Sequence, residues 1–319
     1  MTRKKLFITT MFIIMAMFCT AGTAFAEKTF LSIATGGTSG TYYPIGGAIA
    51  KVVSDGSNIQ ATAETANASV ANVNLVAAKE IEVAFVQNDI TFWAYTGKVM
   101  FSSPLTNLRA IAALYPEHIQ LITAKGSVIN TIDDLKGKRV GVGAPGSGTE
   151  GDVRAIMQVG GLKYSDMRAD FLDFGGTTSR FKDNQIDAGF VVAGFPTASV
   201  MDLATTKDIS LLSFTPDFLN KLSKEFPFFV PSTIPAGTYR GLDKDVSTPA
   251  VVAILITHDE IPDDVIYEFT KTMFGDIAEI HAAHAMAKEI KLENALNGLT
   301  VPLHPGAARF YKEKGMKVD

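Results

Sequence analysis

Cysteine is almost absent from this sequence, and a long apolar run occurs only at its start. The single cysteine among the 319 residues is Cys19, so the chain cannot form an internal disulfide or a multi-cysteine metal site. After residue 26, no stretch approaches the ~20 apolar residues that a membrane helix needs. Low-complexity segments are missing too. The 47% hydrophobic and 19% charged residues are typical of a globular chain with a large core.

The first 26 residues have the layout of a secretory signal peptide. Residues 3–5 read Arg-Lys-Lys, residues 6–26 carry no charge, and Ala-Phe-Ala at 24–26 places small residues where signal peptidase cuts. We therefore expect residues 1–26 to be removed and the remaining chain to work in the periplasm. We do not expect a lipid anchor on Cys19, because a bulky Met-Phe pair precedes it.

Acidic residues outnumber basic residues, and the expected cleavage increases the difference. The whole chain has 29 basic and 33 acidic residues, and three of the basic ones lie in the signal segment. The remaining 26 basic and 33 acidic residues give a net charge of −7. This balance argues against nucleic acid and against an anionic membrane surface as partners.

The hydrophobic pattern predicts two closely joined α/β units. Residues 30–114 alternate between short apolar strands and amphipathic helices, as in a parallel sheet with helices on its faces. A second unit begins with a separate strand at 119–124. Further on, we expect a strand at 251–257 and one continuous helix over 261–280. Asn67 is placed to cap the helix that follows it.

Two glycine-rich loops stand 108 positions apart, each between a strand and a helix. They read GGTSGTYYPIG (36–46) and GAPGSGTEG (143–151). Such a turn exposes backbone N–H groups at the positive end of a helix, where an anion can bind. Because ligands of open α/β sheets bind beyond the carboxyl ends of the strands, one loop per unit could hold a small carboxylate from both sides of a cleft.

Other interpretations of these residues exist. The loops could serve only as tight turns and helix caps. Residues 141–146 also match G-x-G-x-x-G, a weak indication of a dinucleotide site that is unexpected in an exported chain. His281 and His284 lie three positions apart, but no zinc-protease motif surrounds them. Tyr42, Tyr43 and Tyr115 could be core residues or walls of a pocket. We expect no metal, no cofactor and no enzymatic activity.

Several longer segments resemble one known family. TGGTSGTYYPIG, EVAFVQNDI, GVGAPGSGTE, DAGFVVAGFPTASV, IPAGTYRGLDKDV and KLENALNGLTVPLHPGAARFY are similar to segments of the solute-binding receptors of TRAP transporters, in the TAXI subfamily. The likeness runs over essentially the whole chain after the signal segment. It implies an α/β, two-lobed periplasmic binding protein of the type II-like, Venus-flytrap kind, with a hinge.

The resemblance also implies domain boundaries, partners and a ligand. Lobe I would comprise residues 27–118 and about 250–319, and lobe II about 119–249. A monomeric receptor would deliver its ligand to integral-membrane TRAP permease subunits, fused or separate, that run on an ion gradient. Family ligands are small acids or amino acids of the glutamate, glutamine or 2-oxoglutarate kind. An exported enzyme acting on a small carboxylate on the same scaffold is the alternative.

Matching motifs place the ligand contacts on residues of both lobes. The implied ligand-binding residues are Gly37, Thr38, Ser39, Thr41, Tyr42, Asn67, Gln87, Tyr115, Gly146, Ser147, Gly148, Thr149 and Phe195. Gly176 and Arg180 depart from the family pattern, which puts ligand choice in doubt. No arginine lies within the best-matched loops, so backbone amides and hydroxyls are the expected anion partners, with Arg154 or Arg180 giving distant help.

Overall fold

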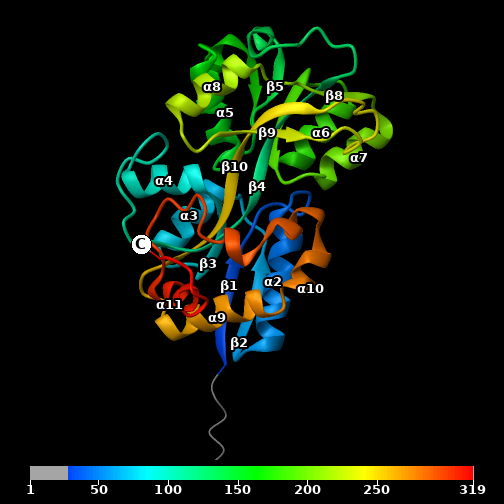
Figure 1. Ribbon diagram of the computed structural model, residues 1–319. Coiled ribbons are helices and arrows are strands. Elements are labelled where there is room, and N and C mark those ends of the chain that lie inside the picture. The colour runs from blue at the N-terminus through cyan, green and yellow to red at the C-terminus, as the bar shows by residue number, and fades with distance from the viewer. Residues whose placement is uncertain (1–27, 319) are drawn as a thin grey trace, which may run out of the picture.

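The protein has a two-lobed α/β fold built on one curled sheet. The computed structural model describes residues 28–318, so the predicted signal peptide lies outside the described residues. Figure 1 shows two halves joined by two long strands, β4 and β10, which pass through both. The strands are β1 (Thr29–Ala34), β2 (Ile59–Glu64), β3 (Val83–Gln87), β4 (Leu108–Ala124), β5 (Arg139–Gly141), β6 (Arg168–Asp170), β7 (Ala188–Ala193), β8 (Ile209–Leu211), β9 (Val230–Ile234) and β10 (Val246–His258).

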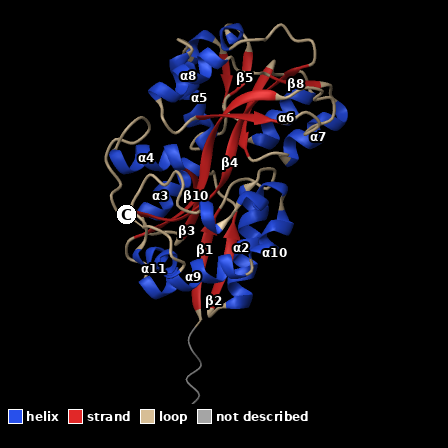
Figure 2. Cartoon of the chain, viewed as in Figure 1, coloured by secondary structure: helices blue, strands red, loops and turns tan. Residues whose placement is uncertain are grey.

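The lobe that carries the N-terminal strands has a parallel core. The strand order of the sheet is β2-β1-β3-β10-β4-β7-β5-β6, and β1 pairs in parallel with β2 and β3. All five residues of β3 are buried, as expected for a parallel strand covered on both faces. Strand β10 then joins this sheet in the antiparallel direction. The carboxyl ends of β1 and β3 therefore lie at the same edge, toward the other lobe (Figure 2).

The sequence prediction of two separate strands at 108–114 and 119–124 is wrong. Strand β4 is continuous over 17 residues and pairs with β10 in one lobe and with β7 in the other. Pro116 reads as a strand break, because proline removes a ladder hydrogen bond from the middle of a sheet. Pairing of Pro116 with Val252 of β10 carries the strand past it. The lobe boundaries at residues 118 and 250 stay a prediction.

Helices cover both faces of the sheet in each lobe (Figure 2). The predicted single helix over 261–280 is wrong: it is divided at Asp276, whose φ of −125° and ψ of 50° are not helical. Asn67 does not cap the next helix, because that cap position belongs to Ala68 at φ 61°. The helices are α2 (Tyr42–Gly56), α3 (Ser69–Ala77), α4 (Asn88–Thr96), α5 (Gly148–Val159), α6 (Phe174–Lys182), α7 (Ala198–Thr206), α8 (Pro216–Glu225), α9 (Asp263–Gly275), α10 (Ile277–Ala283) and α11 (Pro305–Glu313).

One apolar cluster is continuous through both lobes. It includes Val86 and Ile90 on one side and Val153 and Phe229 on the other. Separate clusters fill the space under α2, α9 and α11 and the space under α6 and α7. Because this cluster is shared, we expect the two lobes to unfold together.

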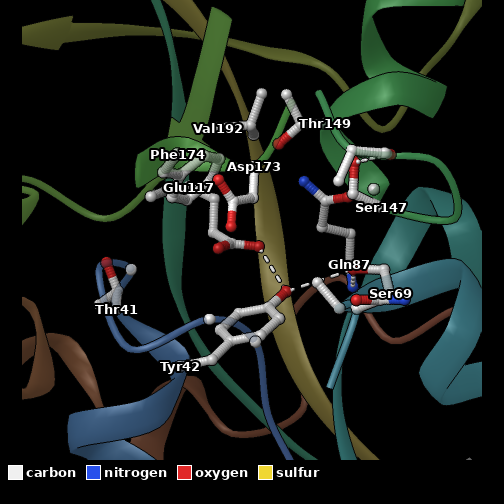
Figure 3. A pocket seen from close by; sticks show the side chains of 18 of the residues that line it. Thr41, Tyr42, Ser69, Gln87, Glu117, Ser147, Thr149, Asp173, Phe174 and Val192 are labelled. Carbon is white, nitrogen blue, oxygen red and sulfur yellow. Dashed lines mark hydrogen bonds between the residues drawn. The ribbon is translucent and has the colours of Figure 1, made fainter. Parts of the chain in front are cut away.

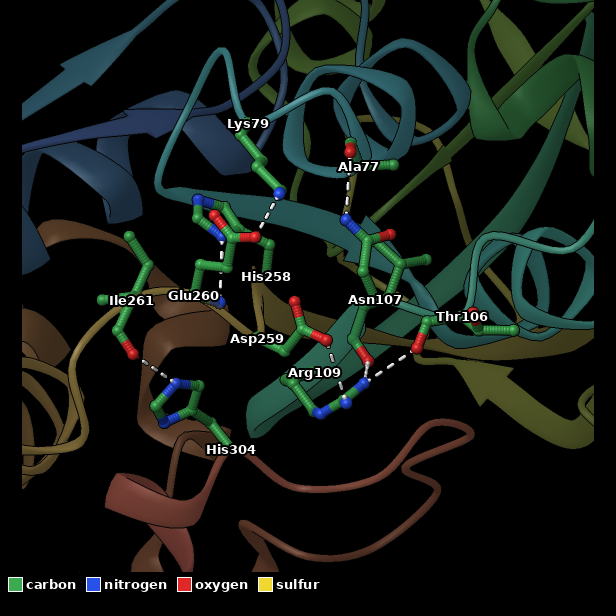
Figure 4. A network of polar contacts seen from close by, with 11 residues as sticks. Ala77, Lys79, Thr106, Asn107, Arg109, His258, Asp259, Glu260, Ile261 and His304 are labelled. Carbon is green, nitrogen blue, oxygen red and sulfur yellow. Dashed lines mark hydrogen bonds and ion pairs between the residues drawn. The ribbon is translucent and has the colours of Figure 1, made fainter.

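A polar network closes the end of the sheet that lies away from the second lobe (Figure 4). The Arg109 guanidinium donates to Asp259 at 3.2 Å and to the carbonyl oxygens of Thr106 and Leu108. His304 is fully buried and bonds the carbonyl of Ile261 at 2.9 Å. These contacts fix the turn after β10 against the start of β4.

Candidate functional site

A cavity of about 110 Å³, lined by polar and apolar residues, lies between the two lobes. Both glycine-rich loops contribute to its wall, and Figure 3 shows side chains from both lobes pointing into it. The volume is sufficient for several waters or a small metabolite. The lining residues are Gly36, Gly37, Ser39, Gly40, Thr41, Tyr42, Ala66, Asn67, Ala68, Ser69, Gln87, Glu117, Ala144, Ser147, Gly148, Thr149, Asp173, Phe174, Val192 and Ala193.

Most of the residues that the sequence assigns to the ligand lie around this one cavity. Those at its wall are Gly37, Ser39, Thr41, Tyr42, Asn67, Gln87, Ser147, Gly148 and Thr149. The carboxyl end of β3 places Gln87 there, as its position after an apolar run predicts. Two loops more than 100 residues apart thus come together over one space, because each follows a strand whose carboxyl end faces the other lobe.

The other four predicted residues are not at the wall. Thr38 is exposed to solvent, and Tyr115 is buried in the core beneath α2. The carbonyl of Gly146 accepts a hydrogen bond from the backbone N–H of Ala71 at 3.0 Å. The ring of Phe195 packs edge-on against His118 with 4.6 Å between the ring centroids. Gly146 and Phe195 thus take part in contacts near the junction between the lobes, and Tyr115 in the core.

Tyr42 is the aromatic wall of the cavity. It is the first residue of α2, and its ring lies 5.1 Å from that of Phe85, centroid to centroid. Its hydroxyl donates to Oε2 of Glu117 at 2.8 Å (Figure 3). Burial raises the pKa of this hydroxyl well above 10, with the neighbouring Glu117 adding to the shift. Tyr42 is therefore a neutral donor that orients a carboxyl group.

Helix starts surround the cavity. Tyr42, Ser69, Gly148 and Phe174 are the first residues of α2, α3, α5 and α6, and all four line the wall. The positive ends of these helix dipoles favour negative charge on a bound molecule. The capping interpretation also holds for Ser147, whose Oγ accepts from the N–H of Glu150 at 3.2 Å.

Two acidic residues of the site, Glu117 and Asp173, are not among the residues predicted from the sequence. Glu117 lies in the middle of β4 and is 2% exposed, while Asp173 caps α6 by accepting from the N–H of Gly176 at 2.6 Å. Asp173 follows a short strand, a position that could have identified it. The sequence around Glu117 gives no such indication, because it predicts two separate strands where the structure has the single strand β4.

No lysine, arginine or histidine is among the residues that line this cavity. The two arginines considered as distant anion partners have other roles in the described structure. Arg154 pairs with Glu150 at 2.7 Å and Arg180 with Asp170 at 3.0 Å. The site thus combines helix starts that attract anions with carboxyl groups that attract donors.

Hydrogen bonds among the described residues join the lobes around the cavity. They include Thr41 Oγ1 to the Gly194 carbonyl (3.1 Å), Ser199 N–H to the Ser39 carbonyl (3.3 Å), Ala71 N–H to the Gly146 carbonyl (3.0 Å), Gln87 Nε2 to Asp152 Oδ2 (2.8 Å) and His284 Nε2 to the Pro196 carbonyl (3.1 Å). The contacts occur on several sides of the cavity, so the structure is a closed form in which the lobes meet over the site.

Two α/β lobes, two strands passing between them and a cavity at the junction define the architecture of a type II-like periplasmic binding protein. The chain belongs to the NMT1-like family, whose sequence model matches residues 33–315. Among the described residues, no helix has the length and apolar character needed to cross a bilayer.

Solved structures agree with this fold. A protein from Bordetella bronchiseptica RB50 is 19% identical, with a TM-score of 0.53 over 91% of this chain and 99% of that chain. The binding protein component of an ABC phosphonate transporter from Pseudomonas aeruginosa is 12% identical, with a TM-score of 0.55 over 91% and 95%. PhnD1 from Prochlorococcus marinus (MIT 9301), in complex with methylphosphonate, is 12% identical, with a TM-score of 0.55 over 82% and 91%.

We expect the buried carboxyl of Glu117 to make stability fall as the pH rises. Burial, with the charge of Asp89 adding to it, raises the pKa of Glu117 from 4.5 to about 8. The folded protein then keeps a proton that the unfolded chain loses near pH 4.5, so this stabilisation is complete below that pH and is lost as the pH passes 8. One pKa unit corresponds to about 1.4 kcal/mol, so we expect a total of roughly 3–5 kcal/mol.

Thermal unfolding of the wild type and of Glu117→Gln between pH 5 and 9 measures this contribution. The glutamine keeps an acceptor for the Tyr42 hydroxyl and has no proton to lose, so the melting temperature of the variant should depend less on pH. Equal slopes for the two proteins would contradict a protonated Glu117.

Proposed function

We propose that this protein is the solute-binding component of a membrane importer and that its lobes close over one small solute in the periplasm. The observation that carries the proposal is a cavity between the lobes that is walled by both glycine-rich loops. Only the closed form brings both halves of the wall to one solute, so binding favours closure. The protein would act as a monomer and deliver its solute to integral-membrane subunits.

The charge pattern of the cavity favours an amino acid over other small acids. A carboxylate of the solute would lie at the helix starts around Gly148 and Thr149, where backbone N–H groups are available. Its ammonium group would face the carboxylate of Asp173, with the carboxyl oxygens of Glu117 as further acceptors. A solute with two carboxylates and no ammonium group would meet Asp173 without any basic side chain at the wall. Glutamate or glutamine therefore suits the cavity better than 2-oxoglutarate.

The type of transporter is the second part of the proposal. The motif resemblance favours a TRAP system of the TAXI subfamily, whose permease subunits, fused or separate, use an ion gradient. The structural neighbour from Pseudomonas aeruginosa is the binding protein of an ABC phosphonate transporter, which makes an ABC importer of phosphonates the competing candidate. The lack of a basic side chain at the cavity wall is the observation against a phosphonate.

An exported enzyme on the same scaffold is the alternative class. It would need an activated nucleophile or a free pair of carboxylates. At this cavity Glu117 accepts from Tyr42 and Asp173 caps α6, so both carboxyl groups already have structural partners. Conversion of glutamate, glutamine or 2-oxoglutarate by the pure protein would favour the enzyme.

A thermal-shift screen tests the proposal directly. Glutamate, glutamine, 2-oxoglutarate and methylphosphonate are added separately to the mature chain, because a bound solute raises the melting temperature by linkage. We expect an amino acid to give the largest shift. A shift with methylphosphonate alone would favour the ABC phosphonate system. No shift with any small acid, amino acid or phosphonate would contradict solute capture.

Two substitutions test the location of the site. Gln87 contributes Oε1, a buried acceptor without a donor, and Thr149 presents a buried hydroxyl at the start of α5. Gln87→Ala and Thr149→Ala should each weaken binding of the solute found in the screen by ~1–3 kcal/mol, the usual cost of a buried partner left unpaired. Calorimetric titration measures this change, and unchanged affinity in both variants would place the solute elsewhere.

A further inference from the structure

Two buried aspartates act on each other where α4 of the first lobe approaches α5 of the second, and a Cβ added at Gly151 of α5 would lie 2.7 Å from Ile90 of α4. Asp89 is the second residue of α4 and Asp152 lies in the second turn of α5, and both side chains are 0% exposed. Gln87 Nε2 donates to Oδ2 of Asp152 at 2.8 Å across the same junction. No donor with good hydrogen-bond geometry reaches Oδ1 of Asp152 or either carboxyl oxygen of Asp89. Two ionised carboxylates in this position would repel each other, and the Gln87 amide and the backbone N–H groups of Asp89 and Ile90 offset this repulsion only in part.

The surroundings of the pair offer no positive charge to compensate it. Glu117 on β4 is the further ionisable group that acts on Asp152, and Glu117 in turn neighbours Tyr42 and Tyr115. Helix α3, which packs against α4, has no charged residue. The remaining charged groups on α5 and on the α8 helix beside it are directed elsewhere or exposed: Glu150, Arg154, Asp217, Lys221, Lys224 and Glu225.

A shared proton resolves this arrangement. Burial raises the pKa of Asp152 well above its ordinary value, with the charge of Asp89 and the hydrogen bond to it adding to the shift. Burial also raises the pKa of Asp89 to about 6, while the hydrogen bond from Asp152 opposes that rise. Near neutral pH, Asp152 therefore carries the proton and donates to an ionised Asp89. The O–H of the protonated Asp152 thus supplies the hydrogen-bond donor to Asp89.

We propose that Asp89 and Asp152 share one proton across the lobe junction and that this proton stabilises the closed form. Asp152, held in this way, positions Gln87 at the cavity. The proposal rests on the proposed capture of a solute by lobe closure. In an open form both carboxyl groups would contact water and ionise separately. Closing near neutral pH then takes one proton from water onto Asp152, which becomes the donor to Asp89. Rising pH removes this proton and favours opening.

Small-angle X-ray scattering of the mature chain without added solute tests the proposal between pH 5 and 9. We expect the radius of gyration of the wild type to increase with pH. Asp152→Asn replaces the titrating donor with a permanent amide donor to Asp89, so its radius of gyration should change less with pH. Asp217→Asn, which removes an exposed carboxylate on α8 and leaves the pair intact, should open as the wild type does. A constant radius for the wild type, or an equal increase in Asp152→Asn, would overturn the proposal.

Infrared spectroscopy supplies an independent readout if a variant alters the overall shape. The difference spectrum of wild type minus Asp152→Asn at pH 7 should contain the carbonyl band of a protonated carboxylic acid. A difference spectrum with only carboxylate bands would also overturn the shared proton. Neither measurement needs a solute, so failure of the shared proton and failure of the proposed transport function give distinguishable results.

Discussion

Gly148→Ala should weaken solute binding by roughly 10–100-fold, the equivalent of the ~1–3 kcal/mol that overpacking costs in a close-packed site. A Cβ at residue 148 would lie 1.5 Å from Oε1 of Gln87, 2.5 Å from its Cδ and 2.8 Å from Oγ of Ser69. All three atoms belong to the first lobe, whereas Gly148 begins α5 in the second. The methyl group would therefore enter the space in which the closed lobes meet.

We expect this substitution to make closure of the lobes less favourable and to leave the stability of each lobe unchanged. Gly148 is a helical residue without a positive φ, so alanine suits its backbone. Gln87 could turn away, but it would then lose its hydrogen bond to Asp152. The control is Gly47→Ala in α2, where an added Cβ meets nothing within 4 Å and where alanine stabilises a helix by about 0.5–1 kcal/mol.

Calorimetric titration with the solute that stabilises the wild type most measures both variants. We expect Gly47→Ala to bind as the wild type does. If Gly148→Ala also bound with wild-type affinity, the close approach of Gln87 and Gly148 would not belong to the solute-bound form. The proposed closure over the second loop would then be wrong.

The loops and their meeting point could be predicted because local rules determine them. Glycines before a helix start, a strand before each loop and the alternation of strands and helices all depend on neighbouring residues. The carboxyl end of β3 placed Gln87 at the cavity for the same reason. The proposed roles of these residues in binding still depend on the experiments above.

The acidic half of the site could not be predicted, because it depends on pairing between distant strands. Glu117 lies beside the cavity only because β4 continues past Pro116 along β10. The sequence pattern predicts that Asp152 is a surface residue of an amphipathic helix, whereas in the structure it is buried beside α4. The break at Asp276 between α9 and α10 is a further example, since Ile277 and Ile280 continue the helical spacing of the sequence while the backbone departs from it.

Trp93→Ala should lower the free energy of unfolding of the whole protein by about 3–5 kcal/mol, the usual loss for a large buried aromatic side chain. Trp93 is the only tryptophan of the chain and is 3% exposed. It lies on α4 of the first lobe, but its ring packs edge-on against Phe226, which follows α8 of the second, with 6.1 Å between centroids. A Cβ added at Gly151 of α5 would lie 3.4 Å from the same indole.

The side chain of Trp93 therefore belongs to the apolar cluster that both lobes share. Removing it creates a cavity at the junction of the lobes, so both should become less stable together. Urea unfolding followed by circular dichroism should give one transition in the wild type and in Trp93→Ala, with the variant shifted to lower urea. Trp93→Phe keeps part of the ring contact and should lose less stability. A loss below about 1 kcal/mol in Trp93→Ala, or an early transition of one lobe alone, would mean that the lobes are joined by strands β4 and β10 and not by a common core.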